Sequence, residues 1–377
     1  MRVLHLNTGN ENGGGMHHIL SLLSQFNDGE VILGLFEHGE MMEQALQKGI
    51  PVVLFEQQNQ KDLTIIFEVI RYLKEFEIDF VHTHGPRATF LAALMKTFIK
   101  QPILTTIHSN PNDDFSGQGI KGKMFYKLYK WAFKSVDHFL VVSDEFSTVM
   151  KNDFQIEEHQ ISTIWNGIVF EPDQINRLNR EDLGFSNHDL LIVMIARLEP
   201  VKRHDLAIEA FEHLSQHQPN AQLLLIGEGT QKDYINHLIK QKGLQNKIHL
   251  LGYREDAQNV LELADVCLLT SKSESFPIVL LEAARAKVPI VTTNVGDVKQ
   301  LIPNEDYGTV VNRVTPETLS QAIYNTIQKE TSQQTERLYQ HAKNHYSLQH
   351  FYTRVRQIYE NLNNEQIQCK EFVKKYQ

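Results

Sequence analysis

The feature that most constrains this chain is an alternation of short apolar runs with longer segments of helical period. The runs are rich in Val, Ile and Leu and lack polar alternation, which is typical of parallel strands covered by helices on both faces. Segments 16–26 and 62–77 have the helical period. The strands expected in the first half are 2–8, 30–36, 51–55, 79–84, 102–108 and 137–143.

The same alternation begins again after a polar stretch at 171–189. Because few apolar residues there would tie the two halves together, we expect the linker in this stretch. The pattern predicts two Rossmann-like α/β domains, 1–175 and 186–345, whose doubly wound parallel sheets face one cleft. A last helical segment, 346–377, is expected to pack back on the first domain. The strands expected in the second half are 190–196, 222–226, 248–251, 265–270, 289–293 and 309–311.

Length and composition exclude several classes of protein. A chain of 377 residues exceeds what one core usually serves, and 41% hydrophobic with 22% charged residues is ordinary for a soluble globular protein. No apolar run approaches the roughly 18 residues of a membrane span. A formal net charge of −9 argues against sequence-independent nucleic-acid binding, which needs clustered Lys and Arg.

The first residues and the cysteines favour a reducing, cytoplasmic setting. Met1 leads directly into the apolar run 3–6, which suits a strand and not a signal peptide. Only Cys267 and Cys369 occur, and Cys267 lies within an apolar run. We therefore expect a buried thiol there and no disulfide or zinc framework.

The most informative segment is the loop and helix that follow the expected strand 265–270. It reads Ser-Lys-Ser-Glu-Ser-Phe-Pro-Ile-Val-Leu-Leu-Glu-Ala and contains Glu274 and Glu282. Pro277 suits the first helical position, so we expect the helix to begin near Phe276. At about 1.5 Å per residue the two carboxylates are roughly 8 Å apart along the axis, too far to share a proton or a metal.

The amide groups that open this helix predict an anion site. The N–H groups of Phe276, Ile278 and Val279 have no acceptor in the first turn, and the helix dipole is positive there. Ser275 and Pro277 belong to the same loop. A carboxylate beside such a site is a strong acceptor for sugar hydroxyl groups. Two acids at this spacing are also common on solvated surfaces, so the pair gains weight only from its context.

In this context the chain resembles the retaining GT-B glycosyltransferases of family 4, whose hallmark is two Glu residues separated by seven residues in such a loop and helix. Further motifs of that family occur in order along nearly the whole chain. Arg197 and Lys202 match its Arg and Lys, five apart, after the first strand of the second domain. Each alone is typical of a surface charge. As a pair at a strand end they are placed to neutralise a diphosphate.

Glycines and an arginine extend the resemblance. Gly227 lies in Gly-Glu-Gly, where the family lets the backbone approach the donor, although plain turns use this pattern too. Arg254 follows Leu-Gly-Tyr and matches the segment that borders the nucleotide base. Gly14 and Gly15 precede the first expected helix, in a loop that faces donor phosphates or acceptor in the family; a tight turn is the alternative. His18 stands where the dinucleotide fingerprint requires Gly or Ala.

Histidines lie in two of the strands expected in the first domain. His108 ends Thr-Thr-Ile-His and resembles the family's site near the transferred sugar and acceptor; alone, such a His is more often a structural hydrogen-bond partner. His82 and His84 alternate on one strand and share a face, which invites a metal interpretation. The sequence offers no carboxylate or Cys cluster to complete it. The family carries a similar His-x-His without a metal, so we expect packing and no metal site.

A basic, aromatic stretch occupies 123–136. Both an ordinary amphipathic helix and a helix that rests on anionic lipid fit this pattern. The residues expected to face inward are Phe125, Leu128, Tyr129, Ala132 and Val136. The residues expected to face outward are Lys127, Lys130, Trp131 and Lys134.

The resemblance implies a metal-independent transfer, with retention, from a nucleotide-diphosphate sugar to a glycan, lipid-linked or cell-envelope acceptor. UDP is favoured as the nucleotide, and no cofactor is expected. Arg197, Lys202 and the helix start would stabilise the leaving diphosphate. Glu282 would hold the ribose, and Glu274 would orient the sugar. If this helix contacts lipid, the sugar transfer would take place at the inner face of the membrane.

Two alternatives share this architecture. A nucleotide-sugar 2-epimerase eliminates and re-adds the nucleotide and needs no acceptor. A catalytically silent GT-B subunit would bind a partner glycosyltransferase. The chain retains both Glu residues with Arg197 and Lys202, which counts against the silent subunit.

Overall fold

The chain divides into two compact units. The first comprises Met1–Gly167 with Leu348–Gln377, and the second comprises Ile168–Ser347. The boundary at Gly167 precedes the polar stretch 171–189, of which 172–177 lie outside the described residues. The computed structural model describes residues 1–10, 14–56, 62–112, 114, 119–171 and 178–376, with side chains as far as 364.

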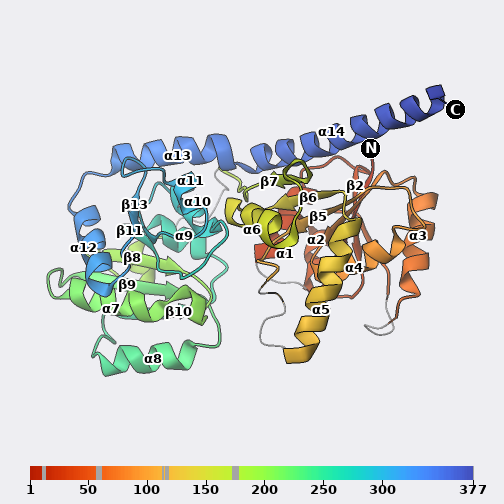
Figure 1. The fold of residues 1–377 in the computed structure, drawn as a ribbon. Helices are drawn as coiled ribbons and strands as arrows, with labels where there is room; N and C mark the ends of the chain where they lie inside the picture. Colours follow the sequence, from red (N-terminus) through yellow and green to blue (C-terminus); the bar gives the residue numbers. More distant parts are fainter. Residues whose placement is uncertain (11–13, 57–61, 113, 115–118, 172–177, 377) are drawn as a thin grey trace. The chain divides into compact units, whose positions relative to one another are not determined.

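The first unit is built on a seven-stranded parallel sheet of order β3-β2-β1-β4-β5-β6-β7 (Figure 1). The strands are β1 Val3–Asn7, β2 Val31–Leu35, β3 Val52–Leu54, β4 Phe80–His84, β5 Ile103–Ile107, β6 His138–Val141 and β7 Ile161–Thr163. The helices of this half are α1 Gly14–Leu23, α2 Glu40–Gln47, α3 Ile65–Glu75, α4 Pro86–Met95, α5 Gly119–Ala132 and α6 Asp144–Phe154. All six expected strands are present, and β7 is a short edge strand beyond them.

Alternate strand residues face two different cores, as the period of two requires. Val81 and Ile103 pack in a cluster with residues of α3, α4 and α6. Their chain neighbours Phe80 and Leu104 pack in a second cluster with residues of α1 and α2. The sheet is therefore covered on both faces, which explains its continuous apolar strands.

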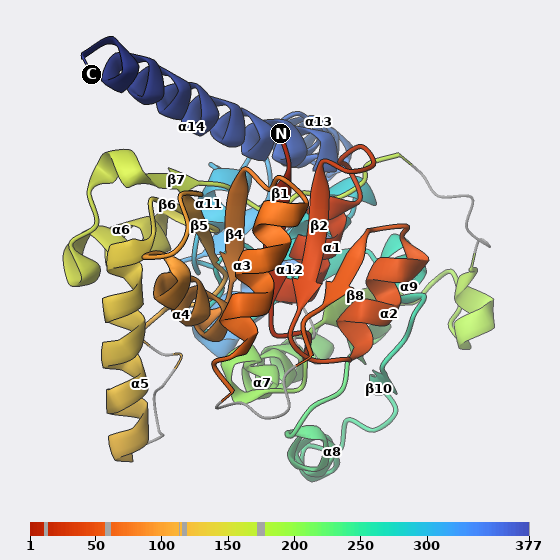
Figure 2. The same cartoon turned by 90° about the vertical axis from the view of Figure 1, so that its right-hand side faces the viewer.

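The C-terminal helix completes the second of these clusters. α14, Leu348–Tyr376, follows α13, Ser332–Tyr346, after a break at Ser347, and runs along the first unit (Figures 1 and 2). Phe351, Val355 and Tyr359 of α14 are buried among residues of α1 and β2. The predicted packing of the last helix on the first domain is confirmed.

The second unit is built on a six-stranded parallel sheet of order β10-β9-β8-β11-β12-β13. Its strands are β8 Leu190–Ile195, β9 Ala221–Ile226, β10 Ile248–Gly252, β11 Val266–Leu269, β12 Ile290–Thr293 and β13 Thr309–Val311. Its helices before α13 are α7 His204–Ser215, α8 Lys232–Gln241, α9 Ala257–Glu262, α10 Ile278–Arg285, α11 Val298–Leu301 and α12 Pro316–Ile327. Every strand expected in this half is present.

Two local expectations are wrong. α1 begins at Gly14, so Gly14 and Gly15 form its first turn and not a loop before it; Gly13 lies outside the described residues. On α5, Phe125 and Leu128 are exposed, although Tyr129 is buried as expected. The helical period correctly indicates an apolar stripe on this helix. How much of that stripe is buried depends on the elements that pack beside the helix.

Candidate functional site

The second unit holds a partly buried ion pair at the carboxyl end of its sheet. Lys202 Nζ donates to Glu274 Oε1 at 2.6 Å, and Ser271 Oγ donates to the same oxygen at 2.6 Å. The side chains of Lys202 and Glu274 are 17% and 13% exposed. The structure thus brings together two of the predicted site residues, which lie 72 positions apart in the chain.

The turn that carries Lys202 is fixed to the end of β11. A 3₁₀ helix, Pro200–Lys202, follows β8 and closes at Arg203, which is left-handed at φ 53°. Thr270 Oγ1 donates to the carbonyl oxygens of Lys202 and Arg203, at 2.9 and 3.0 Å. The backbone N–H of Lys272 donates to the carbonyl oxygen of Val201 at 2.8 Å. These bonds hold the lysine opposite the loop that bears the glutamate.

The loop that carries Glu274 rests on the turn after β12. The N–H of Asp297 donates to the carbonyl oxygen of Ser275 at 3.0 Å. Gly296 has φ +48°, and a Cβ there would lie 2.2 Å from the Glu274 carbonyl oxygen, so only glycine fits. Phe276 is 2% exposed and packs on Tyr346, with ring centroids 4.8 Å apart. The loop is therefore anchored on both sides of Ser275.

The helix after this loop begins later than the sequence suggests. α10 starts at Ile278, and Pro277 is its N-cap in extended conformation, with φ −74° and ψ 114°. Its carbonyl oxygen accepts from the N–H of Leu280 at 3.1 Å. The N–H groups of Ile278 and Val279 lie in the first turn, where helix geometry provides no acceptor. With Lys202 nearby in the same unit, this helix start can attract a diphosphate.

Glu282 belongs to a separate network on α10. Gln258 Nε2 donates to Glu282 Oε1 at 2.8 Å, and Arg285 donates to Gln258 Oε1. Gln258 thereby orients the carboxylate from α9. Glu274 and Glu282 thus have different partners, which agrees with their predicted separation along the chain.

Gly227 and Arg254, two further predicted residues of this unit, make contacts within the protein scaffold. A Cβ on Gly227, at φ +142°, would lie 2.1 Å from the carbonyl oxygen of Ala196, so the strand ends approach closely there. Arg254 forms a bidentate pair with Asp256 at 2.8 and 2.7 Å, which raises the pKa of the arginine. Arg197 is exposed at the end of β8. Donor contacts of these residues remain predictions.

The first unit gathers histidines in its central strands β1 and β4 and just after β5. His108 Nε2 lies 3.1 Å from His84 Nδ1, and His84 Nε2 lies 2.9 Å from His5 Nδ1. The sequence does not point to His5, because it stands alone in β1. In the parallel pairing of β1 with β4, His5 lies opposite His82. Only this long-range pairing shows that His5 belongs to the histidine cluster. Among the described residues, His5, His82 and His84 offer ring nitrogens within 4.8 Å of one another, a closer cluster than the sequence indicates.

Burial keeps these imidazoles neutral. It lowers the pKa of His5 to about 3 and that of His18 to about 4. It also lowers the pKa values of His82, His84 and His108 well below 6.5, and neighbouring imidazoles add to the effect. Around neutral pH the cluster is therefore a set of hydrogen-bond donors and acceptors without charge.

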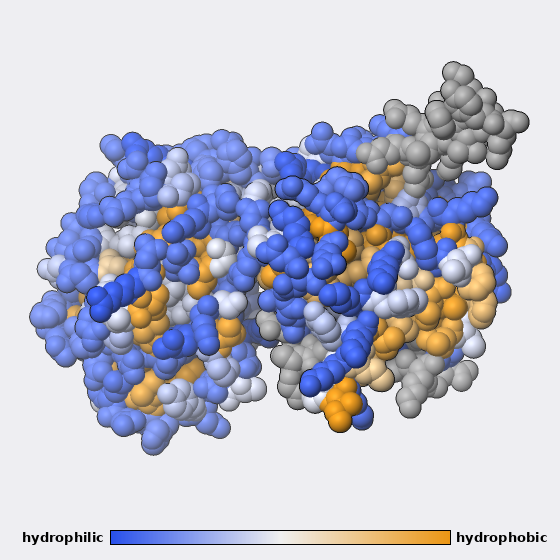
Figure 3. All heavy atoms as spheres, viewed as in Figure 1, coloured by the Kyte–Doolittle hydropathy of each residue, from blue (hydrophilic) through white to orange (hydrophobic). Residues whose placement is uncertain are grey.

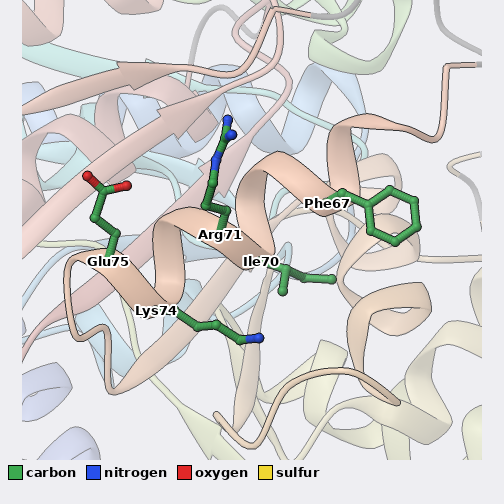
Figure 4. A pocket seen from close by; sticks show the side chains of 5 residues that line it. All are labelled: Phe67, Ile70, Arg71, Lys74 and Glu75. Atoms are coloured by element: carbon green, nitrogen blue, oxygen red, sulfur yellow. The ribbon is translucent and has the colours of Figure 1, made fainter.

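The first unit also has a hollow on its surface, away from the histidines. A surface hollow lies along α3, lined by Phe67, Ile70, Arg71, Lys74 and Glu75 (Figure 4). Its lining comes from one helix and includes none of the predicted site residues, so we assign it no catalytic role.

No helix in the described part of the chain is long and apolar enough to cross a membrane.

Two doubly wound Rossmann-like units, with a last helix that returns to the first, define the GT-B class of fold. The family model Glycosyltransferase Family 4 matches residues 13–171, and the model Glycosyl transferases group 1 matches residues 175–345. Together they cover almost the whole chain. The protein belongs to the group 1 glycosyltransferases.

Curated relatives and solved structures agree with this assignment. The chain is 25% identical over 263 residues to UDP-Gal:alpha-D-GlcNAc-diphosphoundecaprenol alpha-1,3-galactosyltransferase of Escherichia coli, with 67% of each chain covered. It is 27% identical over 255 residues to N-acetyl-alpha-D-glucosaminyl L-malate synthase of Bacillus anthracis, covering 66% of this chain and 65% of that one. The matches span about two thirds of these relatives' lengths. The crystal structure of Anabaena HepE with UDP has the same fold, at 20% identity and TM-score 0.82, covering 97% of this chain and 100% of that one.

Proposed function

We propose that this protein transfers a sugar, with retention and without a bound metal or other cofactor, from a UDP-sugar to a glycan or lipid-linked acceptor. The observation that carries the proposal is the Lys202–Glu274 pair beside the start of α10. Lys202 supplies a positive charge for the leaving diphosphate, and the α10 amides supply hydrogen-bond donors. Glu274 lies next to the lysine, where it would orient the sugar and stabilise its developing positive charge.

The arrangement supports electrostatic catalysis by fixed groups. In the proposed complex Lys202 lies between the carboxylate and the diphosphate, so it neutralises both without moving far. Preorganised charges in a partly buried site stabilise a transition state more than the same charges in water, because no solvent needs to reorganise. Glu282, oriented by Gln258, would accept hydrogen bonds from the ribose. His108 would lie beside the transferred sugar.

The donor is best tested by thermal shift with UDP-, GDP- and ADP-sugars. A ligand at about 100 times its Kd stabilises the native state by roughly 2.7 kcal/mol, so the true donor class stands out. HepE of Anabaena was solved with UDP and with UDP-glucose, which favours UDP here. We expect Lys202→Met to abolish the shift and Lys272→Met, an exposed lysine of the same loop region, to keep it. A shift with GDP-sugars alone would overturn the choice of nucleotide.

The same donor panel separates transfer from epimerisation. Donor incubated with the protein and no acceptor should remain unchanged at C2 of the sugar, as followed by NMR. Conversion to the 2-epimer would show that the protein is an epimerase and not a transferase. Donor binding without transfer to any acceptor in a membrane or glycan extract would instead indicate a silent subunit.

The outer face of α5 supports a lipid-linked acceptor. This helix exposes apolar side chains among lysines, and hydrophobic atoms gather at its end in Figure 3. Ile120, Met124 and Trp131 are 88%, 52% and 43% exposed. Apolar side chains flanked by lysines suit the boundary of an anionic bilayer. We propose that α5 rests on the inner leaflet while the enzyme reaches its acceptor.

Vesicle sedimentation tests this surface. The protein should bind vesicles that contain anionic phospholipid and should bind zwitterionic vesicles weakly, with loss of binding as salt rises. Ile120→Ser combined with Lys127→Glu should reduce binding strongly. Lys240→Glu, which makes the same charge change on α8, should leave it unchanged. Equal binding of both vesicle types, or equal effects of the two variants, would remove α5 from the proposal.

A further inference from the structure

A continuous file of hydrogen-bonded rings crosses the first unit and ends at a partly exposed histidine. We call His108, His84, His5, Tyr359 and His82 the imidazole file. His108 Nε2 lies 3.1 Å from His84 Nδ1, and His84 Nε2 lies 2.9 Å from His5 Nδ1. Tyr359 Oη lies 3.2 Å from His5 Nε2 and 2.5 Å from His82 Nδ1. Each link is within hydrogen-bond distance.

The inner end of the file is closed by a threonine. His82 Nε2 lies 2.7 Å from Thr106 Oγ1 on the neighbouring strand β5. Tyr359 comes from α14, more than 350 residues along the chain from His5. All members of the file except His108 are buried. The rings must therefore satisfy one another, because their nitrogens are shielded from water.

The two contacts of Tyr359 indicate where its single proton lies. A phenol O–H makes a shorter hydrogen bond than an imidazole N–H, whose N···O distances centre near about 2.9–3.0 Å. His82 Nδ1 is the nearer of the two nitrogens, and we take it as the acceptor of the Tyr359 proton. His5 Nε2–H is then the donor to the Tyr359 oxygen.

Every other link follows from this direction. A neutral imidazole has one N–H and one acceptor nitrogen. His5 protonated on Nε2 must accept at Nδ1, so His84 donates from Nε2–H. His84 must then accept at Nδ1, so His108 donates from Nε2–H. The low pKa values of these residues keep one proton on each ring. His108 Nδ1 is left with a lone pair.

We propose that Tyr359, through His5 and His84, fixes the tautomer of His108, so that His108 offers Nδ1 as an acceptor to a substrate hydroxyl group. The last clause rests on the proposed function, which places His108 beside the transferred sugar. Tyr359, His5 and His84 are positioning residues, since they act on the substrate only through His108. The C-terminal helix thereby contributes to the chemistry of a residue on β5.

A second histidine agrees with this polarity. His18 Nδ1 lies 2.6 Å from Asn166 Oδ1, so its proton is on Nδ1 and its Nε2 is an acceptor. That Nε2 is buried and has no hydrogen-bond partner among the described residues. The His18 ring stands edge-on to His108, with centroids 4.8 Å apart. Two acceptor nitrogens suit the hydroxyl groups of a sugar and would repel a carboxylate or phosphate.

A divalent cation is the competing interpretation of the same cluster, because His5, His82 and His84 have the spacing of a three-His site. In the described structure, however, both ring nitrogens of each of these residues already have a hydrogen-bond partner. A cation would have to displace protons that the file uses. The file accounts for every nitrogen without one.

Nitrogen NMR of the full chain labelled with ¹⁵N-histidine tests the file without any donor or activity, since protonated and bare ring nitrogens differ in shift. The His108 resonances are assigned by their loss in His108→Gln. We expect the Nε2–H tautomer at His5, His84 and His108 in the wild type. Tyr359→Phe should convert His108 to a mixture of tautomers. Tyr352→Phe, which removes another hydroxyl from α14, should leave it unchanged.

Catalysis gives the second readout. Tyr359→Phe should lower kcat/KM for sugar transfer about fivefold, the scale of one hydrogen bond, while Tyr352→Phe should not. Nδ1–H on His108 in the wild type would overturn the proposal, and this result needs no variant to fold. So would an unchanged His108 tautomer in folded Tyr359→Phe, or metal-shifted resonances with stoichiometric metal. If the tautomers are as expected but no sugar is transferred, the proposed function fails and the file stands.

Discussion

The two units use the same βα framework to support opposite kinds of polarity. Within β1 and at the carboxyl ends of β4 and β5 the first unit places neutral imidazoles that share protons. At the corresponding ends of β8 and β11 the second unit places an ion pair, Lys202 and Glu274. A neutral network suits ligand hydroxyl groups, whereas fixed charges suit a diphosphate. The fold fixes where polar groups gather, and the residues at the strand ends decide which ligand chemistry they serve.

The supporting structure differs in the same way. In the second unit, Thr270 and Gly296 bring backbone segments close together and so fix the charged side chains indirectly. In the first unit the polar side chains bond directly to one another. We therefore expect the second site to fail through single charges or single backbone clashes, and the first site to fail through protonation.

The largest effect should follow the loss of the lysine. Lys202→Ala should lower kcat about 10²–10³-fold, because a fixed group that stabilises the leaving group contributes on this scale. Turnover of the donor identified by thermal shift is the measurement. Lys272→Ala, an exposed lysine nearby in the chain, is the matched control and should keep near-normal turnover. If both variants turn over normally, the ion pair is structural and the contrast between the units loses its catalytic meaning.

The next effect concerns the backbone of the second site. Gly227→Ala should destabilise the protein by about 3 kcal/mol, because its Cβ would lie 2.1 Å from a carbonyl oxygen and backbone must move. Gly243→Ala also has positive φ, at +68°, but meets nothing within 4 Å and should cost about 1 kcal/mol. Urea denaturation compares the two. An equal loss of stability in the two variants would show that the backbone at the strand ends of the second unit moves apart with little cost in free energy.

Acid should separate the units. Histidines that are buried with lowered pKa values take up protons in the unfolded chain before the folded one, so stability falls as pH drops below about 6.5, by up to about 1.4 kcal/mol per pH unit for each residue. The first unit has several, including His5 with a pKa of about 3 and His18 with a pKa of about 4. The second has His204, with a pKa of about 4, and His249, whose pKa is lowered less. The first unit should lose stability more steeply.

Hydrogen exchange of the full chain, corrected for the intrinsic effect of pH, measures both units in one sample. Peptides from β1 and β4 should lose protection between pH 7 and pH 5 faster than peptides from β8 and β11. Parallel losses would mean that the imidazoles of the first unit are no more costly to protonate than those of the second. The neutral file would then lose its support.

The architecture was predictable because its signal is local. Twelve expected strands, in two sets, rest on apolar runs that need no partner to be recognised, and the structure contains all of them. β7 gives no such signal, because Ile161–Thr163 is a short edge strand with little apolar sequence. The register of the sheets then places the strand ends, and their polar residues, on one edge.

The site was predictable only where its residues belong to local sequence motifs. Glu274 and Lys202 could be singled out by their motifs, but the contact between them depends on Thr270 and on the close packing at Gly296. The file could not be foreseen, since Tyr359 reads as one more apolar position of an amphipathic helix. Only α14, packed on the sheet, brings its hydroxyl to His5 and His82. Pairing across such sequence distance leaves no local pattern.

The smallest predicted effect sharpens the comparison, because it asks whether position alone matters in the second unit. Thr270→Val removes the hydroxyl that donates to the carbonyl oxygens of Lys202 and Arg203, and should cost about 1 kcal/mol of stability. Thr292→Val removes a hydroxyl buried to the same degree on β12, which donates to Thr293, and should cost about as much. Only Thr270→Val should also lower kcat, by about fivefold, since only it releases the lysine turn. Equal kinetics in the two variants would mean that Lys202 finds its place without this hydrogen bond, and that the charge alone defines the second site.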